Sequence, residues 1–184
     1  MIVGLAPGKH GANRTGRPFT GDFAGKLLYE TLHQYGFASR PVSQDANDGL
    51  RLIDCRITNA VKCLPPENRP LPVEVRTCNR YLELELASLR EGSAVLALGA
   101  IAHGAVLMAF DLKRTAYRFG HGHRHQMPHR LALFDSYHCS RYNTQTGRLT
   151  PDGFRDVVAA IREYLSCPAR SFTARPSRRG RADG

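Results

Sequence analysis

Residues 4–22 read Gly4-Leu5-Ala6-Pro7-Gly8-Lys9-His10-Gly11-Ala12-Asn13-Arg14-Thr15-Gly16-Arg17-Pro18-Phe19-Thr20-Gly21-Asp22 and follow directly on a short apolar segment. Because glycine lets backbone amides approach an anion or a flat ring closely, a loop this rich in glycine predicts a ligand site. Apolar residues at helical spacing follow it, from Ala24 to Tyr35, and the positive end of that helix would face the same ligand. The stretch therefore predicts a strand, a functional loop and a helix.

The rest of the chain continues this alternation. Apolar runs predict further strands at residues 52–61, 94–98 and 131–137. Helical spacing predicts helices at about 73–89, from just after Gly99 to about 110, and from Thr150 to about 165. Thr150 is expected to cap the last helix, with Pro151 in its first turn. This alternation predicts an α/β fold with a parallel sheet covered on both faces and ligands at the carboxyl ends of its strands.

The bulk composition narrows the class of protein. With 184 residues the chain is expected to form one domain, residues 1–167, followed by a basic disordered tail, residues 168–184. The 26 lysines and arginines outweigh 16 acidic residues, and a formal charge of +10 favours a polyanionic partner such as nucleic acid over a merely solvated basic surface. No secretory signal or apolar run of about 20 residues is present, which predicts a cytoplasmic protein.

Four segments that follow predicted strand ends resemble the uracil-DNA glycosylase superfamily. They are the loop ending at Asp22, the stretch Thr58-Asn59-Ala60-Val61, the region after Gly99, and Ser136-Tyr137-His138-Cys139-Ser140-Arg141-Tyr142-Asn143-Thr144. Within that superfamily the chain is most similar, from residue 2 to about 165, to the family 5 (type B) enzymes, which carry an iron–sulfur cluster. The resemblance implies a three-layer α/β/α fold with a central, mostly parallel, four-stranded sheet.

The resemblance also implies a function. The chain is expected to be a monomeric DNA repair glycosylase that flips uracil, and in this family other deaminated bases, out of single- or double-stranded DNA. It would hydrolyse the N-glycosidic bond and leave an abasic site. Because uracil leaves as a delocalised anion, the reaction needs a carboxylate near the sugar and hydrogen-bond donors around the departing oxygen rather than a strong general acid.

The resemblance assigns the two catalytic roles to Asp22 and His138. Asp22 would position and activate water, whereas its alternative role is to cap the helix that follows. His138 would donate a hydrogen bond to the uracil oxygen that gains charge, whereas a lone histidine after a strand is more often a surface or capping residue. In both cases the match to the family motif favours the catalytic interpretation.

The resemblance assigns base recognition to Asn59 and Phe19. The Asn59 amide would accept from uracil N3–H and donate to O4, which discriminates against cytosine, and Phe19 would stack on the flipped ring or anchor the loop to the core. The remaining substrate-binding candidates are Gly4, Ala6, Pro7, Gly8 and Asn143, and the DNA-binding candidates are Lys9, Asn13, Arg14, Arg141 and Tyr142.

The five cysteines are an odd number without an export signal and are expected to be reduced thiols or metal ligands. By the resemblance, Cys63 and Cys78 would be two of the four thiolates of a 4Fe-4S cluster. The family supplies the other two from an N-terminal segment that the sequence lacks. A second departure is Cys139, which stands where the family has proline and would loosen the turn that aims His138 while adding an oxidisable thiol.

Two other functions are compatible with the sequence. Truncation and the Cys139 change would turn the chain into a basic nucleic-acid-binding homologue without catalysis. A metal-dependent enzyme could instead use His121, His123, His125 and His129, although an exposed loop with an accidental histidine run is the favoured interpretation of that segment.

Overall fold

The computed structural model describes residues 1–167 and contains one five-stranded sheet with the strand order β2-β1-β3-β5-β4. Its strands are β1 (Ile2–Gly4), β2 (Ile57–Asn59), β3 (Ala94–Leu98), β4 (Arg124–Gln126) and β5 (Ala132–Ser136). The first three and β5 are parallel, and β4 joins β5 in the antiparallel direction. The carboxyl ends of β1, β2, β3 and β5 therefore open at one edge of the sheet.

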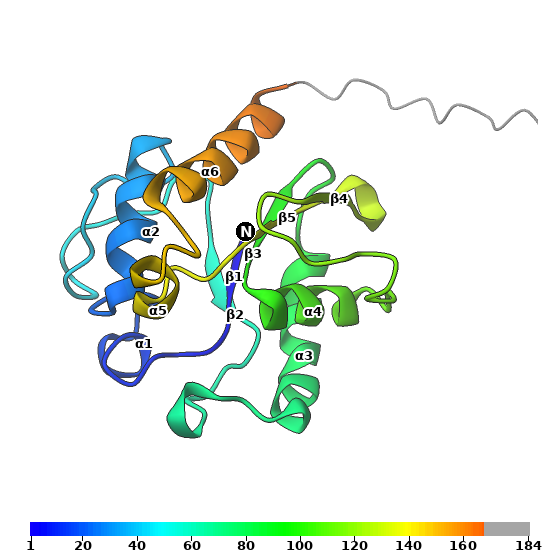
Figure 1. The fold of residues 1–184 in the computed structure, drawn as a ribbon, viewed down its shortest axis with the longest axis horizontal. Helices are drawn as coiled ribbons and strands as arrows, with labels where there is room; N and C mark the ends of the chain where they lie inside the picture. The colour runs from blue at the N-terminus through cyan, green and yellow to red at the C-terminus, as the bar shows by residue number, and fades with distance from the viewer. Residues whose placement is uncertain (168–184) are drawn as a thin grey trace, which may run out of the picture.

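Helices cover both faces of the sheet (Figure 1). One face packs against α2 (Phe23–Gln34) and α6 (Pro151–Ser166), and the other against α3 (Pro72–Ala87) and α4 (Ala100–Ala109). The strands are buried on both faces, so side chains of β1 and β3 alternate between two apolar cores. Two short helices, α1 (Ala12–Thr15) and α5 (Arg141–Gln145), lie in the loops that follow β1 and β5.

The predicted three-layer, mostly parallel architecture is confirmed, with one correction to the strand count. The prediction of four strands missed β4, because Arg124-His125-Gln126 has no apolar pattern and forms only a short edge strand. The continuous apolar run 94–98 forms β3 as predicted, and the Thr150 side chain accepts a hydrogen bond from the Gly153 amide at 3.0 Å at the start of α6.

Two sequence expectations end differently in the structure. The predicted strand 52–61 contains only Ile57–Asn59 as a strand, while Leu52 forms an isolated antiparallel bridge with Ala38. The predicted basic tail, residues 168–184, lies outside the described residues. None of the helices within residues 1–167 combines the length and apolar character needed to cross a membrane.

Candidate active site

The glycine-rich loop brings Phe19 and Asn59 together at the carboxyl end of β1. Gly4 is paired with Asn59 in the parallel register of β1 and β2. A Cβ atom at Gly4 would lie 2.5 Å from Asn59 Oδ1 and 2.8 Å from Phe19 Cζ, so only glycine leaves room for both side chains. Phe19 is buried and has a left-handed backbone with φ of 59°, a strained conformation that a side chain keeps only where its surroundings fix it.

Asn59 has a polar atom that the fold does not satisfy. Its side chain is buried at the end of β2, and Oδ1 has no hydrogen-bond partner among the described residues. A buried carbonyl oxygen without a partner costs free energy, and native structures keep such an atom mainly where a ligand or function uses it. Oδ1 faces the space between Gly4 and the Phe19 ring.

His138 enters the same region from the loop after β5. Its ring centroid lies 5.7 Å from that of Phe19 with an angle of 34° between the ring planes, and its Cβ lies beside the end of β3 at Gly99. The Asn143 amide holds the His138 loop by donating from Nδ2 to the His138 carbonyl oxygen at 2.8 Å. Burial lowers the pKa of His138 to about 4, so the imidazole is neutral at physiological pH.

Asp22 lies where a helix cap would be but does not act as one. It occupies the N-cap position of α2 with an extended backbone, yet its carboxylate makes no capping hydrogen bond. The carboxylate packs instead against the backbone at Gly8 and Gly11, and a Cβ atom at Gly8 would lie 2.7 Å from Asp22 Oδ2. Burial raises the pKa of Asp22, while the positive charges of His10 and Arg14 oppose the shift. The carboxylate therefore packs against the glycine-rich loop and makes no hydrogen bond to the start of α2.

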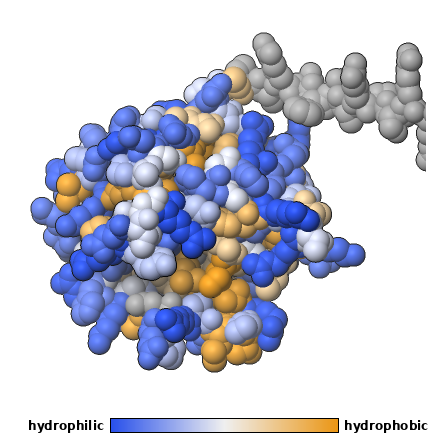
Figure 2. Space-filling model, viewed as in Figure 1, coloured by the Kyte–Doolittle hydropathy of each residue, from blue (hydrophilic) through white to orange (hydrophobic). Residues whose placement is uncertain are grey.

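A groove of about 670 Å³ opens beside Asp22. Its walls come from the start of α2, the loop at Pro41–Ser43 and Arg141, and they include Lys26. Arg141 lies over the exposed Phe23 ring, with its guanidinium carbon 5.0 Å from the ring centroid. Space-filling colours show hydrophobic surface between hydrophilic side chains in the lower part of this view, toward the carboxyl ends of β1 and β2 (Figure 2). The groove borders the site with two cationic side chains.

An ion pair that was not predicted from the sequence braces the glycine-rich loop. Arg17 donates to Asp48 Oδ1 at 2.8 Å, to Ser43 Oγ at 3.0 Å and to the Ala46 carbonyl at 2.8 Å. Thr20 and Ser43 share a hydroxyl–hydroxyl hydrogen bond of 2.6 Å. These contacts fix residues 43–48 against the glycine-rich loop. These contacts could not be predicted from the sequence, because the partners are about thirty residues apart and each residue type is common in loops.

The other predicted contact residues divide into two groups. Ala6, Pro7 and Asn143 are half-buried around the loops that hold Phe19 and His138. The predicted DNA-binding side chains are exposed on the loop after β1 and at the start of α5: Lys9, Asn13, Arg14, Arg141 and Tyr142. Both loops start at the same edge of the sheet, so these exposed side chains surround the buried ones (Figure 1).

Cys63 and Cys78 do not complete a cluster site within residues 1–167. The Cys78 sulfur accepts from the Lys62 amide at 3.5 Å, which places it near the start of the connector, and Cys63 is exposed. Among the described residues, no third cysteine, histidine or carboxylate joins these two thiols in a metal-binding group. Two thiolates alone do not satisfy a 4Fe-4S cluster.

Cys139 lies in the apolar core rather than at the surface of the site. It is fully buried with the α2 and α6 side chains, and burial strongly raises the pKa of its thiol. Since the thiolate is the reactive form, the expectation of an oxidisable thiol beside His138 is corrected to an inert core residue.

The histidine run is only partly the exposed loop that the sequence predicted. His123 and His129 are exposed, as expected. His121 stacks on Tyr137 with ring centroids 5.3 Å apart, and His125 hydrogen-bonds the buried Asp135 at 3.1 Å. Asp135 gave no signal in the sequence because it follows the apolar residues Ala132, Leu133 and Phe134 within the same buried strand.

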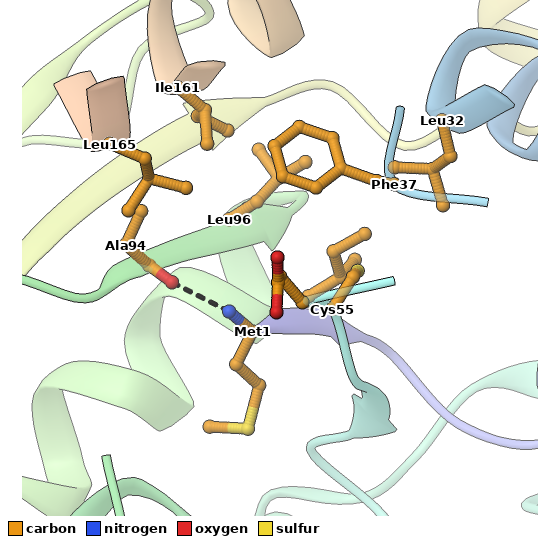
Figure 3. Close-up of a pocket in the computed structure, with 10 residues that line it drawn as sticks. Met1, Leu32, Phe37, Cys55, Ala94, Leu96, Ile161 and Leu165 are labelled. Carbon is orange, nitrogen blue, oxygen red and sulfur yellow. Dashed lines mark hydrogen bonds between the residues drawn. The ribbon is translucent and has the colours of Figure 1, made fainter. Parts of the chain in front are cut away.

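A second, small pocket lies away from these residues. It has a volume of about 30 Å³ and apolar walls that include Met1, Phe37, Cys55, Ala94 and Leu96 (Figure 3). Met1 N donates to the Ala94 carbonyl at 2.6 Å, where β1 and β3 begin. The pocket is therefore at the opposite edge of the sheet from Asp22, Asn59 and His138, and burial raises the pKa of the Cys55 thiol to about 11.

Comparison with known proteins gives the same assignment as the motifs. The model of the Uracil DNA glycosylase superfamily matches residues 1–162. The type-5 uracil-DNA glycosylase of Thermus thermophilus is 49% identical over 158 residues, which cover 86% of this chain and 72% of that protein. The type-5 enzyme of Mycobacterium bovis is 45% identical over 85% of this chain, which spans only 59% of that relative. A type-4 uracil-DNA glycosylase of Archaeoglobus fulgidus is 40% identical over 116 residues, covering 62% of this chain and 50% of that protein. The chain therefore belongs to the uracil-DNA glycosylase superfamily and, within it, to the type-5 family.

Proposed function

We propose that the chain removes uracil from DNA by hydrolysing the N-glycosidic bond, leaving an abasic site. The similarity to type-5 uracil-DNA glycosylases supports the reaction class. The observation that carries the site assignment is the orphaned Asn59 Oδ1, which lies beside the Phe19 ring and within the same loop cluster as His138. This arrangement suits a flat ligand with an N–H group.

The base would be recognised by shape and by one amide. With uracil stacked on Phe19, Asn59 Oδ1 accepts from N3–H and Nδ2 donates to O4. Cytosine has an acceptor at N3 and a donor at C4. Its N3 would therefore face the acceptor Oδ1, and its amino group would face the donor Nδ2. In a buried site the unpaired groups make the wrong base bind poorly. The enzyme must extrude the nucleotide from the duplex before either contact forms.

The reaction would use Asp22 and the neutral His138. As the C1′–N1 bond breaks, its electron pair moves into the uracil ring and positive charge develops on the sugar, where the Asp22 carboxylate stabilises it and orients water toward C1′. The water oxygen bonds to C1′ and its proton passes to Asp22. A ring N–H of His138 donates to the uracil oxygen that becomes negative, and such preorganised donors stabilise a developing charge strongly in a site with little water.

The DNA strand would follow the exposed cations around the site. Arg141 borders the groove beside Asp22, Tyr142 follows it as an exposed residue of α5, and Lys9, Asn13 and Arg14 lie on the loop that ends at Asp22. Arginine and lysine side chains bind phosphates without reading sequence, which suits an enzyme that scans for one base. We propose that Ala6, Pro7, Gly8 and Asn143 line the nucleotide on its inner side.

An iron–sulfur cluster remains a family-based proposal for Cys63 and Cys78. The described residues supply two thiols and no further ligand beside them, so no catalytic step is assigned to a cluster. A monomeric state and a cytoplasmic location likewise stay predictions.

Product analysis separates catalysis from binding alone. Incubating the chain in excess with a labelled uracil-containing oligonucleotide should release free uracil and create alkali-labile sites, with no release from the matched cytosine oligonucleotide. Binding of the uracil oligonucleotide without release of the base would instead identify a nucleic-acid-binding homologue. In that case the His138 loop, which has Cys139 where the family has proline, would be the first candidate for the cause, because a looser turn would no longer orient the His138 ring.

A further inference from the structure

Three side chains outside the proposed active site form a buried cluster with the donor set of a metal site. They come from three elements: His103 from α4, His125 from β4 and Asp135 from β5. His103 Nδ1 lies 2.7 Å from Asp135 Oδ1, and His125 Nε2 lies 3.1 Å from Asp135 Oδ2. The side chains of His103 and Asp135 are 1% and 0% exposed, whereas that of His125 is 14% exposed.

Both ring nitrogens of His103 face oxygen atoms that can accept a hydrogen bond. Its Nε2 lies 2.9 Å from the Tyr117 carbonyl oxygen, which can only accept, so Nε2 must carry a hydrogen. In a neutral imidazole the other nitrogen, Nδ1, then has a lone pair, and this lone pair faces a carboxylate oxygen at 2.7 Å. At this distance a proton shared by the two atoms satisfies both lone pairs, and a metal ion with bonds of about 2.0–2.2 Å could replace that proton if the two atoms moved slightly apart.

We propose that His103, His125 and Asp135 bind a divalent transition-metal ion of the zinc class. Their ligand atoms all lie within 4.8 Å of one another, and two imidazoles with one carboxylate suit zinc and its neighbours rather than calcium or magnesium. His103 is already oriented as in known metal sites, where a ligating histidine donates its other N–H to a carbonyl. The Gly120 amide approaches Asp135 Oδ2 at 3.4 Å.

The ion would have a structural role. It would join α4 and the edge strand β4 to β5, the strand that leads into the His138 loop. Three protein ligands leave a fourth position for water, which can enter on the half-buried His125 side. The proposal does not depend on uracil release, because the cluster takes none of its residues from the proposed catalytic set.

The test is metal binding by the full chain in which Cys63 and Cys78 are replaced by serine, so that those thiols cannot contribute. Zinc chloride titrated into metal-free protein should bind with one equivalent per chain and raise Tm. Cobalt(II) should give visible d–d bands without the intense near-ultraviolet bands of thiolate ligation. Metal content after dialysis checks the stoichiometry independently.

Matched variants identify the ligands. His125→Gln lies at the edge strand and should weaken zinc binding at least tenfold, whereas His123→Gln, from the same histidine run but outside the cluster, should leave it unchanged. Asp135→Asn should act like His125→Gln if it folds. Absence of stoichiometric zinc binding, or equal binding by His125→Gln and the parent, would overturn the proposal and assign the cation to a proton.

Discussion

At the scale of single residues, the site depends on polar groups that folding leaves free. Asn59 illustrates this best, because its buried Oδ1 has no internal partner, while the equally buried Asn79 donates from Nδ2 to the Ala105 carbonyl at 2.8 Å. One amide is available to a ligand and the other is committed to the fold. Substituting Asn59 should therefore affect ligand binding, whereas substituting Asn79 should affect the stability of the fold.

Replacing Asn59 by alanine should slow uracil release about 10- to 100-fold, since a lost buried hydrogen bond costs about 1–3 kcal/mol. The free energy of unfolding should change little, because the buried Oδ1 of Asn59 makes no hydrogen bond within the described fold. Asn79→Ala should do the reverse, lowering stability and leaving the rate unchanged. Single-turnover kinetics and urea denaturation on both variants measure this; an Asn59→Ala variant with the parental rate would remove base recognition from this residue.

The pKa values of Asp22 and His138 are expected to set the pH dependence of uracil release. Burial raises the pKa of Asp22 above its ordinary value, and it lowers the pKa of His138 to about 4, so the imidazole is neutral at neutral pH. The rate of uracil release should fall on the acid side as Asp22 gains a proton, and this fall should begin above the usual pKa range of an aspartate. The residual rate of Asp22→Asn should lack this decline. A parental profile that stays flat through the acid range would contradict the role of Asp22.

At this scale the sequence predicts residue types better than their conformations. Asp22, Asn59, Phe19 and His138 could be named because their order matches a family motif at strand ends. The positive φ of Phe19 and the Arg17–Asp48 clamp could not, because both depend on how distant segments meet.

At the scale of elements, the contact of the glycine-rich loop with α2 is decided by Gly25. A Cβ atom at this position would overlap the carbonyl oxygen of Phe19, which is backbone and cannot rotate away. The helix and the loop therefore approach each other only because Gly25 has no side chain. The Tyr29 hydroxyl adds a second tie by donating to the Pro18 carbonyl at 2.8 Å.

Gly25→Ala should displace the loop that carries Phe19 and reduce both stability and uracil release. We expect a loss of about 1–3 kcal/mol, the usual cost of overpacking a tight contact. Gly153→Ala in α6 is the control, because its added Cβ would meet only side-chain atoms, Thr150 Oγ1 at 3.1 Å and His121 Nε2 at 3.2 Å. Thermal unfolding that ranks the two variants equally would contradict this account of the contact.

Element prediction succeeded where burial is uniform. The run 94–98 is buried at every position and forms the strand β3 as predicted, whereas β4 has exposed polar residues and depends on pairing with β5. Residues 52–56 were predicted as part of a strand, but they do not join the sheet, and Leu52 forms an isolated antiparallel bridge with Ala38. Tertiary pairing overrides local pattern in both cases.

At the scale of the whole molecule, charge and topology act together. The formal charge of +10 attracts DNA over long distances, and the parallel strands direct the candidate site to one edge. The sequence could predict the order of segments and their common edge. It could not predict the groove beside Asp22, which α2, the 41–43 loop and Arg141 enclose only after folding.

DNA affinity should fall steeply with salt, with a log–log slope of about −0.9 for each phosphate contact on duplex DNA. Arg141→Ala should reduce the magnitude of that slope by about one contact. Arg90→Ala, which removes the same charge where β3 begins at the opposite edge of the sheet, should leave the slope unchanged. Fluorescence anisotropy across a salt series measures both. Equal slopes for the two variants would mean that DNA does not use the predicted edge.

The most direct test of the account is single-turnover uracil release by the parent chain, Asp22→Asn and His138→Ala, measured beside their affinity for the same oligonucleotide. Loss of the carboxylate or of the imidazole should lower the rate of bond cleavage at least about 100-fold, as expected for removing a general base or an oxyanion donor, while binding changes little. Parental cleavage rates in both variants would contradict the assignment of the site to Asp22 and His138.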